Sequence, residues 1–269
     1  MLKRIVVGSS LAFAAWGVYR RINRWSSTWG VDEAEQDRAL PGDEIVPDGT
    51  NLLTRGITID APPESVWPWL VQMGYGRAGW YSYDRLDMKG LSADRILPEL
   101  QKLEVGDRLP THEDGGFEVK VLDPNKALVV YLDTALVESW QKKPAESISA
   151  TDTPGLAASG NFLGAASPQE FKVSWAFVLE PAGPGRTRLI ERTRGWFGKG
   201  NPGTKVLMPT LGFGVFVMER RQMLGIKQRV ERSAHFDKVE GEAAVPTTMT
   251  TIAKNGASDH PVIEPSTAG

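Results

Sequence analysis

The stretch "EFKVSWAFVLEPAGPGRTRLIERTRGWF", residues 170–197, decides the fold class of this chain. Apolar side chains recur at every second position in its first half: Phe171, Val173, Trp175, Phe177 and Leu179. This period is typical of a strand with one face in the core. The turn sequence "AGPG" then separates it from a second alternating run. The stretch therefore predicts an antiparallel β-hairpin.

A second hairpin is predicted for "GFEVKVLDPNKALVVYLD", residues 116–133, with its turn at Asp123-Pro124-Asn125-Lys126. Residues 51–60, "NLLTRGITID", indicate an earlier strand. The following "APPESVWPWLVQMG", residues 61–74, opens with prolines that suit a first helical turn. Pro68 removes a backbone donor inside this helix, so we expect it to be short and bent.

The chain closes with its strongest helical pattern, at residues 209–233. One stripe is apolar: Leu211, Val215, Phe216, Met223, Ile226 and Val230. The opposite side is assigned to charged residues: Glu219, Arg220, Lys227 and Arg229. An early strand and helix, then hairpins, then one long helix indicate an α+β fold: a curved antiparallel sheet wrapped around the C-terminal helix. A sheet that closes on a single helix is expected to leave an internal cavity.

An uncharged stretch at Ile5 to Tyr19, "IVVGSSLAFAAWGVY", lies between Lys3-Arg4 and three arginines at 20, 21 and 24. A cleaved signal peptide is the competing interpretation, because "AFA" at 12–14 has the small-x-small pattern. Cleavage there would leave a very short apolar region, so residues 1–25 are predicted to be an uncleaved single-pass membrane anchor. The arginines after the segment favour a cytoplasmic position for the folded domain.

Residues 26–50 are interpreted as a linker before a folded domain at residues 51–235. Within it, "DEAEQDRALPGDE" at 32–44 carries six acids against one arginine and predicts a solvated segment with a turn at Pro41-Gly42. Residues 236–269 have few large apolar side chains and no period, which predicts a disordered tail. The weakly patterned residues 141–168 are expected to be either a mobile lid or a disordered insertion.

The composition excludes several chemistries. Cysteine is absent and only three histidines are present, His112, His235 and His260, so thiol nucleophiles and a three-histidine metal site are not expected. A Ser-His-Asp relay would have to use His112, in the turn "THEDGG". Glycine-rich nucleotide motifs are missing and the net charge is −2, without a basic stripe. We therefore predict no metal, no cofactor and no nucleic-acid partner.

Four segments together resemble a known family: "TRGITIDAPPESVWPWLVQMGYGRAGWYSYD", "LEVGDRLP", "SWAFVLEP" and "TRLIERTRGW". They look like the START-like (SRPBCC) superfamily, in its bacterial polyketide-cyclase-like branch. The resemblance covers residues 28–233 and implies a helix-grip fold with a cavity between sheet and C-terminal helix. Lipid carriers, cyclases and ligand-binding regulators share this fold, so it implies a cavity and not a reaction. The stretch at 141–168 departs from the family by its length.

The segment "GRAGWYSYD", residues 76–84, is the first candidate for the cavity wall, with core packing as the alternative. The full set predicted to bind a ligand is Trp80, Tyr81, Tyr83, Trp140, Trp175, Arg192, Trp196, Phe213 and Phe216. Glu191 and Arg192 must point to opposite faces of their strand, so one of them could face inward. The alternative is that both end in water at the margin of the sheet.

The leading hypothesis is a membrane-tethered domain that binds a hydrophobic small molecule or lipid in its cavity. The second is a cyclase or aromatase-like enzyme, for which Tyr83, Asp84 and Arg192 are the candidate catalytic residues. A third is a scaffold whose tails recruit a partner. The sequence leaves open the ligand and whether any reaction is catalysed.

Overall fold

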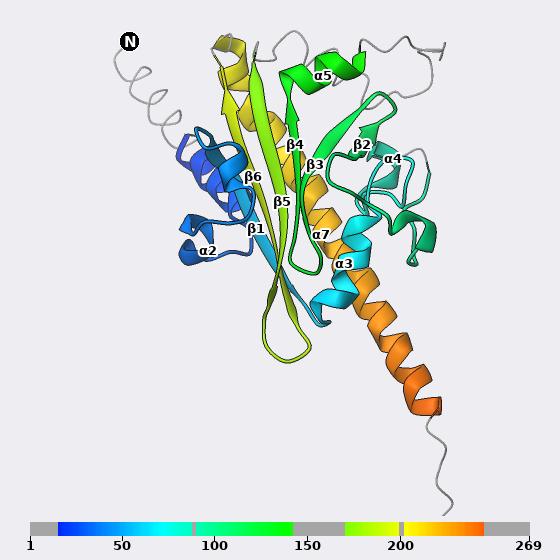
Figure 1. Ribbon diagram of the computed structural model, residues 1–269. Helices are drawn as coiled ribbons and strands as arrows, with labels where there is room; N and C mark the ends of the chain where they lie inside the picture. Colours follow the sequence, from blue (N-terminus) through cyan, green and yellow to red (C-terminus); the bar gives the residue numbers. More distant parts are fainter. Residues whose placement is uncertain (1–15, 88–89, 142–169, 199–201, 245–269) are drawn as a thin grey trace, which may run out of the picture.

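A computed structural model describes residues 16–87, 90–141, 170–198 and 202–244 (Figure 1). Its centre is a six-stranded antiparallel sheet in the order β1-β6-β5-β4-β3-β2. The strands are β1 (Thr50–Ile59), β2 (Arg108–His112), β3 (Gly115–Asp123), β4 (Ala127–Asp133), β5 (Phe171–Pro181) and β6 (Thr187–Phe197). The two predicted hairpins are the β3–β4 and β5–β6 pairs, so the alternating apolar pattern identified both correctly.

One long helix and several short ones accompany the sheet. α7 (Pro202–Ala244) runs diagonally across the sheet, and its last turns extend past it (Figure 1). The short elements are helical residues 16–27, α2 (Glu33–Asp37), η1 (Asp43–Ile45), α3 (Pro63–Val71), α4 (Asp84–Asp87), η2 (Pro98–Leu100) and α5 (Thr134–Gln141). α3 is short, as expected, with prolines in its first turn and Pro68 inside it.

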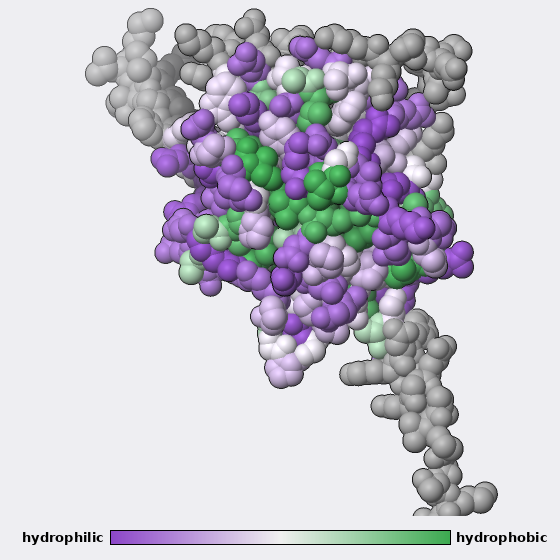
Figure 2. All heavy atoms as spheres, in the orientation of Figure 1, coloured by the Kyte–Doolittle hydropathy of each residue, from purple (hydrophilic) through white to green (hydrophobic). Residues whose placement is uncertain are grey.

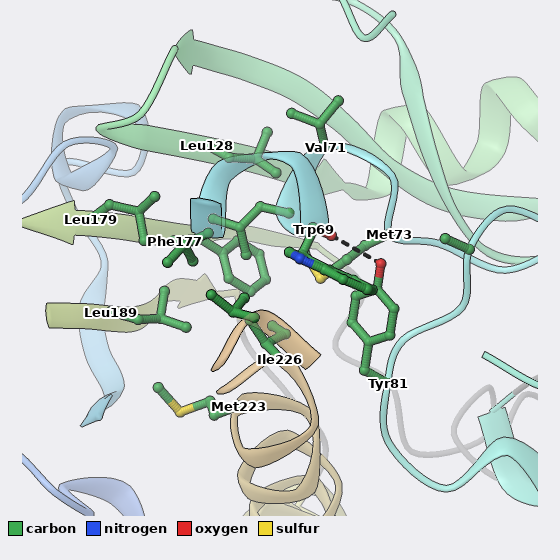
Figure 3. Packing of buried hydrophobic residues seen from close by; sticks show 14 of the residues in the cluster. Trp69, Val71, Met73, Tyr81, Leu128, Phe177, Leu179, Leu189, Met223 and Ile226 are labelled. Atoms are coloured by element: carbon green, nitrogen blue, oxygen red, sulfur yellow. Dashed lines mark hydrogen bonds between the residues drawn. The ribbon is translucent and has the colours of Figure 1, made fainter. Parts of the chain in front are cut away.

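The main core lies between α7, α3 and the face of the sheet that we call the inner face. β5 and β6 contribute Phe177 and Leu189 to this face, and α7 contributes Met223 and Ile226 (Figure 3). All four side chains are fully buried. Burying apolar side chains of this size contributes about 1.5–3 kcal/mol each, so this contact is a major source of the fold's stability.

The opposite, outer face of the sheet is covered by residues 31–47, which we call the N-terminal strap. Leu40 of the strap packs with Val129, Val178 and Ile190 of the sheet in a second apolar cluster. In the view of Figure 2, hydrophobic residues gather near the middle of the folded body, with hydrophilic residues around them. The prediction of a solvated segment at 32–44 is confirmed for most of these residues, which are exposed, but it misses the burial of Leu40 against the sheet. The predicted turn is present at Gly42, whose φ is 95°.

Three arginines on the outer face of β6 hold the strap: Arg188, Arg192 and Arg194. Arg188 binds both carboxylate oxygens of Glu35, at 2.7 Å each, which lowers the pKa of that carboxyl. Arg194 donates to the carbonyl oxygens of Val46 and Pro47. The acidic residues of the strap thus meet a row of cations, and this complementarity is not visible from local sequence.

The predicted membrane anchor falls mostly outside the described residues, since only its part from residue 16 onward is described. Within the described chain, none of the helices combines the length and the apolar character needed to cross a bilayer. Residues 16–27 form an exposed helix. The expected lid or insertion at 142–168 and residues 245–269 of the predicted disordered tail also lie outside the described residues. The tail prediction is wrong for residues 236–244, which continue α7 to Ala244.

Candidate functional site

A pocket of about 180 Å³ lies between the inner face of the sheet and the first half of α7. Its described lining residues are Trp80, Ser82, Thr111, Trp175, Val215, Met218, Glu219 and Gln222. They come from the loop after α3, from β2, from β5 and from α7. Trp80 and Trp175 also contact the main core cluster, so the pocket borders that core.

Two tryptophans make the aromatic wall of this pocket. The rings of Trp80 and Trp175 stack with centroids 5.6 Å apart and an interplanar angle of 16°. Phe117 and Phe177 contact the Trp175 ring from β3 and β5, with centroids 5.8 and 4.6 Å away. Such ring contacts fix the orientation of an aromatic side chain, so the wall is held in place before any ligand arrives.

Tyr81 fixes the loop that carries Trp80. Its backbone adopts a φ of 58°, which is rare for a bulky residue and requires support from its surroundings. Its hydroxyl donates to the Trp69 carbonyl at 3.1 Å (Figure 3) and accepts from Gln72 Nε2 at 2.9 Å. Burial raises the pKa of this hydroxyl, which therefore stays protonated and serves as a structural donor.

The same loop passes very close to α7 at Gly225. A Cβ on Gly225 would lie 2.1 Å from the Tyr81 carbonyl oxygen, so only glycine permits this approach. One residue further on, the Ser82 hydroxyl donates to the Met218 carbonyl at 2.9 Å. These contacts tie the loop to the helix and set the distance between the two sides of the pocket.

A cluster of charged residues is buried beside the pocket. Arg55 of β1, which is 1% exposed, forms an ion pair with Glu219 of α7. Its Nε donates to the Ser26 carbonyl at 2.8 Å, and its guanidinium lies 5.0 Å from the centroid of the Phe216 ring. Glu191 is the direct partner of Arg55 in the pairing of β1 with β6. One cation therefore shares the inner face with two carboxyls.

Glu191 has no hydrogen-bond partner among the described residues for either carboxyl oxygen, although its side chain is fully buried. Desolvation raises its pKa well above the usual value, and the Glu219 carboxylate adds to this, while Arg55 opposes it. The Trp175 indole N–H faces this carboxyl and lowers its pKa slightly, but the contact falls short of a hydrogen bond. Burial also raises the pKa of Glu219, against the pull of Arg55.

Of the residues predicted from "GRAGWYSYD", only Trp80 lines the pocket. Tyr81 is core, and Tyr83 is 41% exposed. The Asp84 carboxylate accepts from the Ser92 hydroxyl at 2.5 Å, away from the pocket lining. Arg192 is fully buried, but on the outer face beneath the strap. Tyr83, Asp84 and Arg192 therefore do not converge on one site.

Trp175 is the second predicted residue that the structure places in the pocket. Trp140 lines a separate hollow of about 100 Å³ with Thr111, His112 and Val137. Trp196 lies under the Lys172 ammonium, with 5.8 Å from the nitrogen to the ring centroid. Phe213 is 46% exposed, and Phe216 is buried against Trp25 and Trp29.

The alternative in which Glu191 and Arg192 both end in water is wrong, since both are buried, with Glu191 facing inward. The helical pattern also assigns Glu219 to the solvated side of the last helix, whereas this residue is 9% exposed and lines the pocket. A signal for its burial is present: Glu219 follows Phe216 by three positions and precedes Met223 by four, the spacing of the buried stripe. Because glutamate is normally placed on the solvent side of a helix, its charge outweighed this spacing in the helical assignment.

No group of three or more histidine or acidic residues in the described part of the chain is placed to hold a metal ion. No family model matches this chain, and no curated protein matches it significantly. Among solved structures, it is similar to the crystal structure of protein MLL2253 from Mesorhizobium loti. The identity is 19% and the TM-score 0.33, over 66% of this chain and 97% of that one. A likeness at this level carries no argument about function.

Proposed function

We propose that this protein is a START-like, helix-grip domain that binds a small hydrophobic molecule, or the end of a lipid chain, in the pocket between its sheet and α7. The observation that carries the proposal is the apolar hollow of about 180 Å³ with its pre-formed tryptophan wall. A pre-formed concave apolar site with a few polar groups is the usual form of a small-molecule site.

The volume limits the ligand. Sites for drug-sized molecules span roughly 300–1,000 Å³, whereas an apolar cavity of about 150 Å³ holds one benzene molecule. A pocket of about 180 Å³ therefore suits a single ring with a short substituent, or the last few carbons of an acyl chain. A whole lipid would have to leave most of its length outside.

A matched pair of substitutions on α7 tests this binding site. Val215 lines the pocket and Val217 does not, yet the two are similarly exposed, at 42% and 38%. We expect Val215→Trp to fill the mouth and abolish binding of ethylbenzene, while Val217→Trp leaves it intact. Binding is read as an increase in melting temperature, because a ligand specific for the folded state at 100 times its Kd adds about 2.7 kcal/mol. Unaltered binding in Val215→Trp would contradict the site.

The second part of the proposal is attachment to a membrane through the N-terminal segment. Residues 16–27 expose Trp16 and Trp25, at 59% and 53%, beside exposed Arg20, Arg21 and Arg24. Tryptophan and arginine on one helix suit the interface between headgroups and acyl chains. Cosedimentation with anionic vesicles should be lost on deletion of residues 1–25. Equal cosedimentation of the full chain and the shortened chain would contradict membrane attachment through this segment.

An enzymatic function of the cyclase type is the second candidate. It is favoured by the two buried carboxyls beside the pocket, because neighbouring acids with raised pKa values are a common source of general acid and base groups. Glu219, which lines the pocket, takes the place of Tyr83, Asp84 and Arg192 in this role. Turnover of a polyketide-like substrate that Glu219→Gln abolishes, without loss of substrate binding, would distinguish catalysis from carriage.

A further inference from the structure

The pocket combines apolar walls with one ionisable side chain among its described lining residues. Among its described lining residues Glu219 is the only charged group, and its side chain is 11% exposed. Of the neighbouring polar groups, the Ser82 hydroxyl already donates its hydrogen bond to the Met218 carbonyl oxygen. A ligand that fills the pocket therefore meets one carboxyl group and no cation among these residues.

The charge balance around Glu219 depends on whether Glu191 holds a proton. Arg55 supplies one positive charge from β1, and two carboxyls share it: Glu219 from α7 and Glu191 from β6. β5 faces Glu191 with Trp175, which carries no charge. Because Arg55 is bound to Glu219, the Glu191 carboxyl has no partner in the described chain. The cluster is thus one positive charge short unless Glu191 holds a proton.

The aromatic wall has the complementary property. The faces of tryptophan rings carry negative charge density and attract a cation placed over them. Arg55 already lies over a ring in this region, that of Phe216, at 5.0 Å. A ligand cation between the Trp80–Trp175 wall and Glu219 would gain both attractions, and these offset the cost of removing it from water.

We propose that the preferred ligand of this pocket is a small hydrophobic amine in its ammonium form, with its ring or alkyl part on the tryptophan wall and its nitrogen at Glu219. This inference rests on the proposed function, because it assigns a ligand class to the same pocket. A single ring with a two-carbon aminoalkyl chain matches the available volume of about 180 Å³.

Three probes of nearly equal shape test the charge preference: 2-phenylethylamine, 2-phenylethanol and phenylacetate. Isothermal titration calorimetry at neutral pH should show the amine binding at least about tenfold more tightly than the alcohol, and the acid most weakly. Glu191→Gln removes the second carboxyl without changing its shape. It should reduce the preference for the amine over the alcohol severalfold and leave the affinity for the alcohol unchanged.

Glu180→Gln is the matched control, because Glu180 pairs with Arg38 at the surface and is not a lining residue of the pocket. This variant should keep the preference for the amine.

A second measurement uses the unaltered protein and needs no variant. A bound ammonium group beside the cluster favours the ionised form of Glu191. Amine binding should therefore release a proton, detected as a binding enthalpy that depends on the ionisation enthalpy of the buffer.

The outcomes separate the two proposals. Equal affinity for the amine and the alcohol, or tighter binding of phenylacetate, overturns the amine preference and leaves hydrophobic binding in place. A preference for the amine that survives in Glu191→Gln, with no proton release, overturns the role of the carboxyl cluster. If none of the three probes binds, and ethylbenzene does not bind either, the pocket itself fails as a ligand site.

Discussion

Two buried arginines on opposite faces of the same sheet are satisfied in different ways. Arg192, on the outer face, is 1% exposed and donates five hydrogen bonds: to Thr54, Asp43 and the carbonyl oxygens of Glu35, Gln36 and Arg38. These use all the donors that a guanidinium has. Arg55, on the inner face, is equally buried, but its cluster leaves the Glu191 carboxyl without a partner in the described chain.

The difference supports a structural role for the outer cluster, and our proposal assigns a ligand-directed role to the inner one. A buried network whose members are all satisfied rigidifies the fold, whereas a buried group left unsatisfied costs about 1–3 kcal/mol and calls for an explanation. The inner cluster borders the pocket, because Glu219 is one of its lining residues. Two substitutions test this contrast and two test the loop beside the pocket, in order of decreasing effect.

Arg192→Ala should cost the most, about 3–5 kcal/mol of unfolding free energy, because it leaves Asp43 and several carbonyl oxygens of the strap without their donor. Urea unfolding followed by tryptophan fluorescence measures the loss. The control is Arg38→Ala, which removes a surface ion pair with Glu180 and should cost at most about 1 kcal/mol. If Arg192→Ala lowers the unfolding free energy by less than about 1 kcal/mol, the outer cluster does not have the structural role assigned to it.

Gly225→Ala should destabilise the protein by about 1–3 kcal/mol, because the new methyl group would overlap the Tyr81 carbonyl. Gly214 lies in the same helix, and a methyl group added there would have no neighbour within 4 Å, so Gly214→Ala is the matched control. It should stabilise the helix by about 0.5–1 kcal/mol. Thermal unfolding compares the two variants, and equal melting temperatures would show that the loop does not rest on α7 at Gly225.

Glu191→Gln should act in the opposite direction and depend on pH. Folding raises the pKa of Glu191 above its usual 4.5, so the folded protein binds this proton more tightly than the unfolded chain does. The stability that follows is complete below pH 4.5 and is lost as the pH rises toward the folded pKa. The amide does not titrate, so the variant should become progressively more stable than the unaltered protein as the pH rises from 4 to 8. Urea unfolding at pH 4, 6 and 8 checks this, and a difference independent of pH would contradict it.

Tyr81→Phe should have the smallest effect, about 0.5–1.5 kcal/mol, through loss of the hydrogen bonds to Trp69 and Gln72. Tyr83→Phe provides the comparison, because Tyr83 is 41% exposed and its change should stay within about 0.5 kcal/mol. Chemical denaturation distinguishes the two tyrosines. A larger loss at Tyr83 would reverse the assignment of core and surface in this loop.

Local patterns in the sequence identify five of the six strands of the sheet, together with α3 and α7, but they do not predict β2 or α5. The alternation in residues 170–197 reports a half-buried strand directly, because side chains of a strand point to opposite faces in turn. For the same reason the sequence shows that Glu191 and Arg192 separate. It does not say which of them faces α7, because that depends on what covers each face.

The strap is the feature that local patterns miss. Its acidic residues indicate solvation, and most of them are exposed, but Glu35 and Asp43 pair with arginines of β6 that lie more than a hundred positions away. The prediction of Arg192 as a ligand-binding residue fails for the same reason. Long-range pairing of charges leaves no periodic signal in a single sequence.

The sequence by itself determined the α+β class, the two hairpins and the long last helix, since periodicity and turn chemistry are local properties of the chain. It named Trp80 and Trp175 only among nine candidates for the pocket. Only the tertiary structure decided the size of the pocket and the inward position of Arg55, Glu191 and Glu219. Both depend on how closely the sheet approaches α7 and on which face the strap occupies. Those distances are set by packing among segments far apart in the chain, and packing is not encoded in any one of them.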